Sequence, residues 1–243
     1  MNDDERLDDL QFAGLKILQK TAGFRFGMDA VLLSDFVRAE AQATVADFGT
    51  GTGILPLLMW GRGKGQRFEA FEIQREMADM ARRSVALNGL SARIRVHEAS
   101  VEEAPSLLAP GSVDVIVCNP PYGMPGATLH NPGLSKDLAR HQDPRGLKPW
   151  FTAAYRLLRG RGRMALIYPA RMMLSLMNDL SRAALIPKRF RLIYPRVDKP
   201  ANLVLVEAVK DARPTLQPEP PLIVYEQDGT MTPELRKIYH QQD

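Results

Sequence analysis

Short apolar runs that alternate with helical patterns from residue 44 onward most constrain the fold of this chain. Seven such runs have the length of strands, and most are separated by stretches with apolar residues at helical spacing. The predicted strands are residues 44–48, 68–72, 93–97, 113–118, 162–168, 190–194 and 202–209. Strands that alternate with helices form a parallel sheet with helices on both faces. We therefore predict an α/β fold with a doubly wound, mostly parallel seven-stranded sheet.

The last two predicted strands are joined by the short loop at residues 195–201, which predicts a hairpin and hence an antiparallel edge. Predicted helices cover residues 28–37, 54–60, 74–87, 150–158 and 172–184. The 243 residues suit one large domain. We expect residues 1–20 to be a polar, loosely attached lead-in. Residues 21–243 are expected to form a single domain that includes a C-terminal extension.

Composition narrows the class of protein. Hydrophobic residues make up 45% of the chain and charged residues 25%, as in ordinary globular proteins. No apolar run approaches the roughly 20 residues that span a bilayer, and the acidic start Met1-Asn-Asp-Asp-Glu5 is unlike a signal peptide. The single cysteine, Cys118, excludes an internal disulfide and lies in an apolar strand, which predicts a buried, inert thiol. We expect a cytoplasmic protein without a membrane segment.

Charge is unevenly distributed along the chain. The formal net charge is +4, yet residues 136–199 contain fifteen Lys or Arg and only four Asp. Arginine predominates there, and its guanidinium suits bidentate phosphate contacts and stacking on bases. Solvated helix faces and a nucleic-acid surface both agree with this pattern, so charge alone leaves the two open.

A glycine-rich loop follows the first strand of the sheet, in the stretch Asp47-Phe-Gly-Thr-Gly-Thr-Gly53. Glycines at alternate positions permit positive φ and let the backbone approach a ligand closely. Their spacing is not that of the dinucleotide fingerprint, and no lysine follows as in a P-loop. Glu72 closes the second strand, where an acid can accept hydrogen bonds from ribose hydroxyls. A tight structural turn is the alternative for the loop alone.

A second motif ends the strand at residues 113–118. The tetrapeptide Asn119-Pro120-Pro121-Tyr122 cannot continue a sheet, because proline has no N–H to donate. It therefore gathers an amide side chain, two carbonyl groups and an aromatic ring at the carboxyl end of a strand. In open parallel sheets that edge is where ligands bind.

Together these motifs resemble those of class I S-adenosylmethionine-dependent methyltransferases, which have a Rossmann-like fold. The resemblance implies S-adenosylmethionine as cofactor, with Asp47 at its amino end and Glu72 at its ribose. Many relatives place an aspartate at the adenine amine, where this chain has Ser100, and the Val101 amide is expected to share that role. The cofactor-binding residues implied in this way are Asp47, Gly49, Thr50, Gly51, Gly53, Glu72, Ser100, Val101 and Asn119.

The tetrapeptide resembles the signature of enzymes that methylate planar exocyclic or amide nitrogens. Such a nitrogen shares its lone pair with the adjoining π system and is a poor nucleophile. Acceptors on Asn119 and Pro120 would bind its two hydrogens and orient it toward the methyl group, while Tyr122 would stack on the flat substrate. The catalytic residues implied are Asn119, Pro120, Pro121 and Tyr122. No metal is expected, because His130 and His141 lack carboxylate partners.

The chain as a whole resembles bacterial tRNA (adenine) N(6)-methyltransferases that act beside the anticodon of a valine tRNA. The resemblance starts at residues 23–33, passes through the tetrapeptide and continues through residues 189–195, 202–207 and 221–225 to Tyr239. It implies a tRNA partner, and no obligate protein partner is evident. The alternatives are methylation of an rRNA base, of a DNA adenine or of a protein glutamine, and a non-catalytic RNA-binding module.

An RNA substrate requires contacts to phosphates. Residues 123–149 show little periodicity, and we expect this loop to lie over the substrate mouth and to be mobile without RNA. The residues predicted to hold RNA phosphates are Arg140, Arg145, Lys188, Arg189, Arg191 and Arg196.

Overall fold

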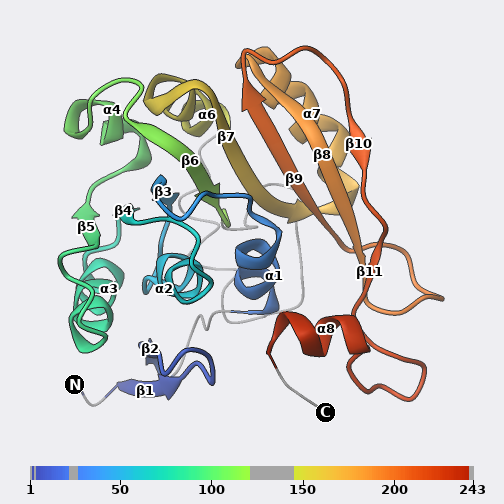
Figure 1. Cartoon of the computed structure of the whole chain (residues 1–243), viewed down its shortest axis with the longest axis horizontal. Coiled ribbons are helices and arrows are strands. Elements are labelled where there is room, and N and C mark those ends of the chain that lie inside the picture. Colours follow the sequence, from blue (N-terminus) through green and yellow to red (C-terminus); the bar gives the residue numbers. More distant parts are fainter. Residues whose placement is uncertain (1, 3, 22–26, 121–144, 241–243) are drawn as a thin grey trace.

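A computed structural model describes residues 2, 4–21, 27–120 and 145–240 (Figure 1). Its core is a nine-stranded sheet in the order β10-β8-β9-β7-β6-β3-β4-β5, with β11 also paired to β8. The seven predicted strands are all present as β3 (Thr44–Phe48), β4 (Arg67–Glu72), β5 (Ile94–Glu98), β6 (Val113–Cys118), β7 (Leu158–Pro169), β8 (Leu185–Tyr194) and β9 (Leu203–Lys210). The predicted α/β fold with a mostly parallel sheet is confirmed.

The antiparallel hairpin is also present, but it does not simply end the sheet. Strand β9 pairs antiparallel with both β7 and β8, so β8 runs in the same direction as β7. Two short strands from the C-terminal extension, β10 (Gln217–Pro218) and β11 (Leu222–Ile223), pair parallel to β8. The turn after β8 therefore lies at the same edge of the sheet as the carboxyl ends of the other parallel strands.

Helices cover both faces of the sheet, as predicted for a doubly wound fold. They are α1 (Met28–Phe36), α2 (Ile54–Gly61), α3 (Arg75–Leu87), α4 (Ala104–Leu107), α6 (Lys148–Leu157), α7 (Met173–Arg182) and α8 (Pro233–Ile238), with 3-10 turns η1 (Val101–Glu103) and η3 (Ala170–Met172). One apolar core holds α1, α2, α3 and α8, and the other holds α4, α6 and α7. In β3, Val45 faces the first core and Ala46 the second, because side chains alternate along a strand. Within the described ranges, no helix is long and apolar enough to cross a membrane.

Residues near the N-terminus form an antiparallel pair, β1 (Glu5–Asp9) and β2 (Lys16–Lys20), outside the main sheet. Ile17 and Leu18 are buried, and the Leu18 N–H donates to Ser84 Oγ of α3 over 3.0 Å. The expectation that this segment is loosely attached is wrong for its described residues. Its few apolar side chains are enough to fix a two-stranded ribbon once α3 supplies the other surface. The domain boundary near residue 20 stays a prediction.

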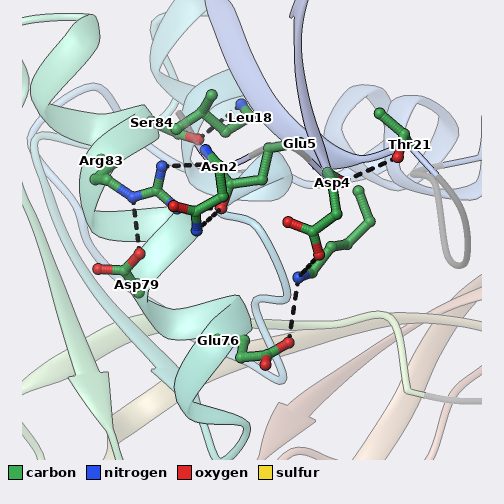
Figure 2. A network of polar contacts seen from close by, with 10 residues as sticks. Asn2, Asp4, Glu5, Leu18, Thr21, Glu76, Asp79, Arg83 and Ser84 are labelled. Atoms are coloured by element: carbon green, nitrogen blue, oxygen red, sulfur yellow. Dashed lines mark hydrogen bonds and ion pairs between the residues drawn. The ribbon is translucent and has the colours of Figure 1, made fainter.

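An ion pair anchors this ribbon to α3 (Figure 2). The Arg83 guanidinium donates to Glu5 Oε2 over 2.8 Å and to Oε1 over 2.5 Å, and its Nε donates to Asp79. Glu5 is only 5% exposed and also accepts from the Asn2 N–H over 2.9 Å. The hydrogen bonds from Arg83 lower the pKa of Glu5 to about 2. This carboxylate is held in its charged form across the ordinary pH range.

Replacing Arg83 by alanine should destabilise the protein, because it leaves the buried Glu5 carboxylate without its cation. We expect the free energy of unfolding at pH 7 to fall by about 1–3 kcal/mol in a urea titration. A folded-state pKa below the ordinary value of 4.5 stabilises above pH 4.5, and this contribution is lost as the pH falls toward 2. The difference in the free energy of unfolding between Arg83→Ala and wild type should therefore shrink in acid.

The matched control is Arg82→Ala, which removes an exposed arginine one position away, paired to the equally exposed Glu98 over 3.2 Å. Its effect should stay within about 0.5 kcal/mol. Equal losses in both variants would refute the anchoring role of the Glu5–Arg83 pair.

Candidate active site

Three neighbouring parallel strands bring the predicted site residues to one edge of the sheet. Strand β3 pairs with β4 on one side and with β6 on the other, and Phe48 lies opposite both Phe71 and Cys118. The loops that follow these three strands therefore begin side by side. The glycine loop follows β3, Glu72 ends β4 and Asn119 follows β6, so the residues of the two motifs meet as predicted.

The glycine loop is held against β4 by its backbone. Gly49 and Thr50 donate to the Phe71 carbonyl over 3.0 and 2.9 Å. Gly49, Gly51 and Gly53 all have positive φ, at 73°, 58° and 90°, which explains why glycine occupies these positions. A Cβ on Gly51 would meet no atom within 4 Å, so the backbone there borders open space. A ligand can approach the chain closely at this point.

Glu72 is buried at the end of β4, where its carboxylate accepts two backbone hydrogen bonds. Its Oε2 accepts from the Gly51 N–H and its Oε1 from the Gln74 N–H, both over 2.9 Å. The acid thus holds the glycine loop in place. A carboxylate has about four acceptor positions, so each oxygen retains capacity for a hydroxyl donor from a ligand.

Asp47 is the most unusual group of the site. It is 1% exposed, and neither carboxylate oxygen has a hydrogen-bond partner among the described residues. Burial raises its pKa to about 7, and the nearby charge of Glu72 acts in the same direction. The Thr50 hydroxyl opposes this shift, but it makes no hydrogen bond of ordinary geometry to the carboxylate. A buried acid without a partner is expected where a ligand supplies the donor.

The end of β5 joins this edge through a backbone contact, because the Ala99 N–H donates to the Glu72 carbonyl over 3.1 Å. Ser100 precedes η1, and its N–H donates to Glu103 Oε2 over 2.8 Å. The Val101 side chain is buried in the core on the α6 side of the sheet. Both residues lie near Glu72 as expected, and their contact with a cofactor adenine stays a prediction.

Asn119 and Pro120 directly follow β6. Asn119 is half-buried and Pro120 is buried. The predicted partners Pro121 and Tyr122 lie outside the described residues, as do Arg140 and residues 123–144 of the loop. Cys118, the last residue of β6, is buried, and burial raises the pKa of its thiol, which agrees with the predicted inert role.

Two side chains at this edge were not identified from the sequence. The ring of Trp150 in α6 meets Phe48 edge-on at 6.4 Å, and a Cβ on Gly49 would lie 3.1 Å from it. No local pattern connects a tryptophan with a loop a hundred residues earlier. Ile73 is 69% exposed directly after Glu72. The available signal was an apolar residue immediately after the acid that closes the strand.

Arg189 does not form the phosphate contact predicted for it. The residue is 5% exposed, and its guanidinium binds Glu207, Glu219 and the carbonyl of Phe36. It also lies over the Phe36 ring, 3.7 Å from the centroid. This prediction was wrong, because the charge pattern of β8 does not show which face of the strand is covered.

The other described members of the predicted phosphate-binding set are dispersed and paired. Arg145 forms a two-pronged ion pair with Glu102 over 2.8 and 3.0 Å. Lys188 donates to the Arg213 carbonyl and to the Thr215 hydroxyl. Arg191 donates to the Pro220 carbonyl and to Glu234, and Arg196 pairs with Asp198. These residues do not form one surface, and a phosphate role for them stays a prediction. Arg196 lies in the turn after β8, at the same edge of the sheet as the end of β6.

A sequence model of the methyltransferase small domain family matches residues 27–172, more than half of the chain. The chain belongs to this family. The matched segment contains the glycine loop, Glu72 and Asn119, which are the parts of the site assembled above. The enzyme class predicted from these motifs, a methyltransferase, is confirmed.

Relatives that are named as methyltransferases match this chain over most of its length. A tRNA1(Val) (adenine(37)-N6)-methyltransferase of Parabacteroides distasonis is 28% identical and covers 86% of both chains. A protein with the same name from Tolumonas auensis is 28% identical over 92% of this chain and 91% of its own. The crystal structure of a predicted O-methyltransferase from Agrobacterium tumefaciens is 26% identical, with a TM-score of 0.70 over 88% of this chain and 96% of its own.

The residues of this methyltransferase fit S-adenosylmethionine as methyl donor. The ammonium group of S-adenosylmethionine would supply the hydrogen bonds that the buried Asp47 carboxylate lacks. The ribose hydroxyls of the cofactor match the remaining acceptor positions of Glu72. The open space beside Gly51 leaves room for the chain between them.

Replacing Asp47 by asparagine should stabilise the ligand-free protein at pH 8, because burial of this carboxylate penalises its charged form. The folded pKa of about 7 lies above the ordinary value of 3.8, so the penalty develops between these pH values and is constant above 7. We expect the free energy of unfolding in urea to rise by about 1–3 kcal/mol at pH 8 and not to rise at pH 4. The rise is smaller than the full penalty for the charged carboxylate, because the asparagine amide is also buried without a partner.

Asp114→Asn is the matched control. Asp114 already accepts from the Thr44 N–H over 2.8 Å and pairs with Arg159 over 2.6 Å, so its replacement should not stabilise. A loss of stability in Asp47→Asn at pH 8 as large as in this control would contradict the account of Asp47.

Proposed function

We propose that this methyltransferase transfers the methyl group of S-adenosylmethionine to the exocyclic amine of an adenine in tRNA, near the anticodon. The observation that carries the proposal is the position of Asn119, which leaves β6 directly beside the strand that bears the glycine loop. The names of relatives that match most of the chain support adenine in tRNA as the substrate.

The cofactor side of the site orients the methyl group. When bound, S-adenosylmethionine supplies an electrophilic methyl group on a sulfonium. Asp47 would bind its amino end and Glu72 its ribose, two fixed points on adjacent strands. The exposed Ile73 side chain would cover one face of the adenine. Binding at several points sets the direction of the methyl group, which is what an in-line displacement requires.

The substrate side overcomes the weak nucleophilicity of an adenine amine. The Asn119 side-chain oxygen and the Pro120 carbonyl would accept its two hydrogens and stabilise the positive charge that develops on nitrogen. The nitrogen lone pair forms the new bond to the methyl carbon, and the electrons of the broken carbon–sulfur bond stay on sulfur. The amine then loses a proton to solvent, so no strong base is needed. The target base must leave its stack to reach these groups.

A tRNA substrate agrees with the excess of arginine in residues 136–199, and it implies that the enzyme works in the cytoplasm. The test is a transfer assay with radiolabelled methyl donor and three acceptors: tRNA, DNA and protein. Label in tRNA alone is the expected result. Label in protein or DNA without label in tRNA would overturn the assignment.

Replacing Asn119 by alanine should nearly abolish methylation while cofactor binding is retained, because the side chain acts chiefly on the nucleophile and Asp47 and Glu72 would still hold the donor. We expect kcat to fall by about 100-fold or more, and calorimetry to show an unchanged affinity for the donor. The control Asn202→Ala removes an exposed amide at the same edge of the sheet. Full activity in Asn119→Ala would rule out the proposed clamp.

A further inference from the structure

A cavity lies near the amino ends of β6 and β7, away from the edge of the sheet that carries Asn119. Its volume is about 870 Å³, which is within the range of small-ligand sites. Asp114 at the start of β6 and Arg159 at the start of β7 form part of its wall, and the segment after α1 closes another side. Strand β6 has six residues, so about 17 Å separates this cavity from the methyl-transfer edge.

The lining of this cavity is strongly basic. Seven of its described lining side chains are Lys or Arg and four are Asp or Glu, an excess of three positive charges. Several of the cations are paired internally: Arg159 with Asp114 over 2.6 Å, and Arg38 with Glu219 over 3.2 Å. Arg163 and Arg189 pair with Glu207, and Arg191 pairs with Glu234. Among the described lining residues, Arg161 and Lys64 are the cations without an acidic partner.

Arg161 is the clearest of these. No ion pair or hydrogen bond joins its side chain to any described residue, and the residue is exposed at the cavity. Lys64 lies on the same lining and, within the part of the chain that the structure describes, donates only to the carbonyls of Ser34 and Asp35. Burial lowers the pKa of Lys64 to about 8, and a bound anion would raise this pKa again.

Arg161 lies in an irregular stretch of β7. Val113 pairs with Leu158 and Val115 with Arg163, so β7 has three more residues than β6 between two successive pairs. Arg161 occupies this bulge with φ of 65°, a left-handed conformation that is unfavourable for arginine. A Cβ on Gly162 would lie 3.0 Å from the Arg159 carbonyl, which requires glycine there. Strained backbone of this kind is common at binding sites.

We propose that this cavity binds phosphate groups, and that their source is the RNA backbone at a distance from the methylated base. An arginine that protrudes from a bulge into a cavity without a partner of its own, as Arg161 does, matches phosphate recognition. The choice of RNA over a free polyphosphate rests on the proposed function, whereas the phosphate site itself does not. A tRNA engaged at Asn119 can reach an anchor about 17 Å away.

The test compares Arg161→Asn with wild type in binding to a tRNA transcript, without methyl donor, across a salt series. Asparagine tolerates the left-handed backbone, so the variant removes charge with little change in fold. We expect affinity to fall about 3- to 10-fold at low salt, and the slope of log K against log salt to decrease by about one. Arg161→Lys should recover most of the affinity. The control Arg95→Asn removes an exposed arginine of β5 and should change neither quantity.

Inorganic tripolyphosphate distinguishes the two sources of phosphate. It should raise the Tm of wild type more than that of Arg161→Asn in either case. A rise in Tm without a change in tRNA affinity would assign the site to a free polyphosphate and refute its RNA role. Identical behaviour of Arg161→Asn and Arg95→Asn in both assays would overturn the site itself. Because neither assay uses methyl transfer, a failure of the proposed activity would be seen separately.

Discussion

The parallel pairing of β3 with β4 and β6 is the constraint on which the site depends. Parallel strands place their carboxyl ends at one edge, so three segments far apart in sequence deliver Asp47, Glu72 and Asn119 to one place. Glu72 then couples the strands more tightly, because it fixes the glycine loop through the Gly51 N–H. A change in the register of any of these strands would separate the cofactor side from the substrate side.

Two features of this edge do not contribute to the stability of the ligand-free protein. Asp47 is buried without a partner, and the glycine loop takes three positive-φ positions. Neither feature helps the ligand-free protein fold, and both are explained by a ligand with an ammonium group and a close approach to the backbone. The stability of the protein comes from elsewhere: two apolar cores, the Glu5–Arg83 anchor and the internal pairs around Arg189.

Local sequence patterns predicted the sheet and the residues at its active edge, because strand alternation, glycine spacing and a proline stop are local features. They did not predict the ribbon of β1 and β2, whose stability depends on contact with α3. The pairing of β10 and β11 with β8 and the position of Trp150 against Gly49 are likewise long-range. Charge patterns failed at Arg189 for a related reason. A sequence shows that a residue is basic, whereas only the fold shows whether an acid already neutralises it.

The most direct test of the central claim is nucleoside analysis of tRNA after methyl transfer. Total tRNA from a strain that lacks the gene would be incubated with the purified enzyme and labelled S-adenosylmethionine, then digested and separated. We expect the label in N6-methyladenosine. Label in a methylated guanine, or in a ring nitrogen or oxygen of any nucleoside, would contradict it.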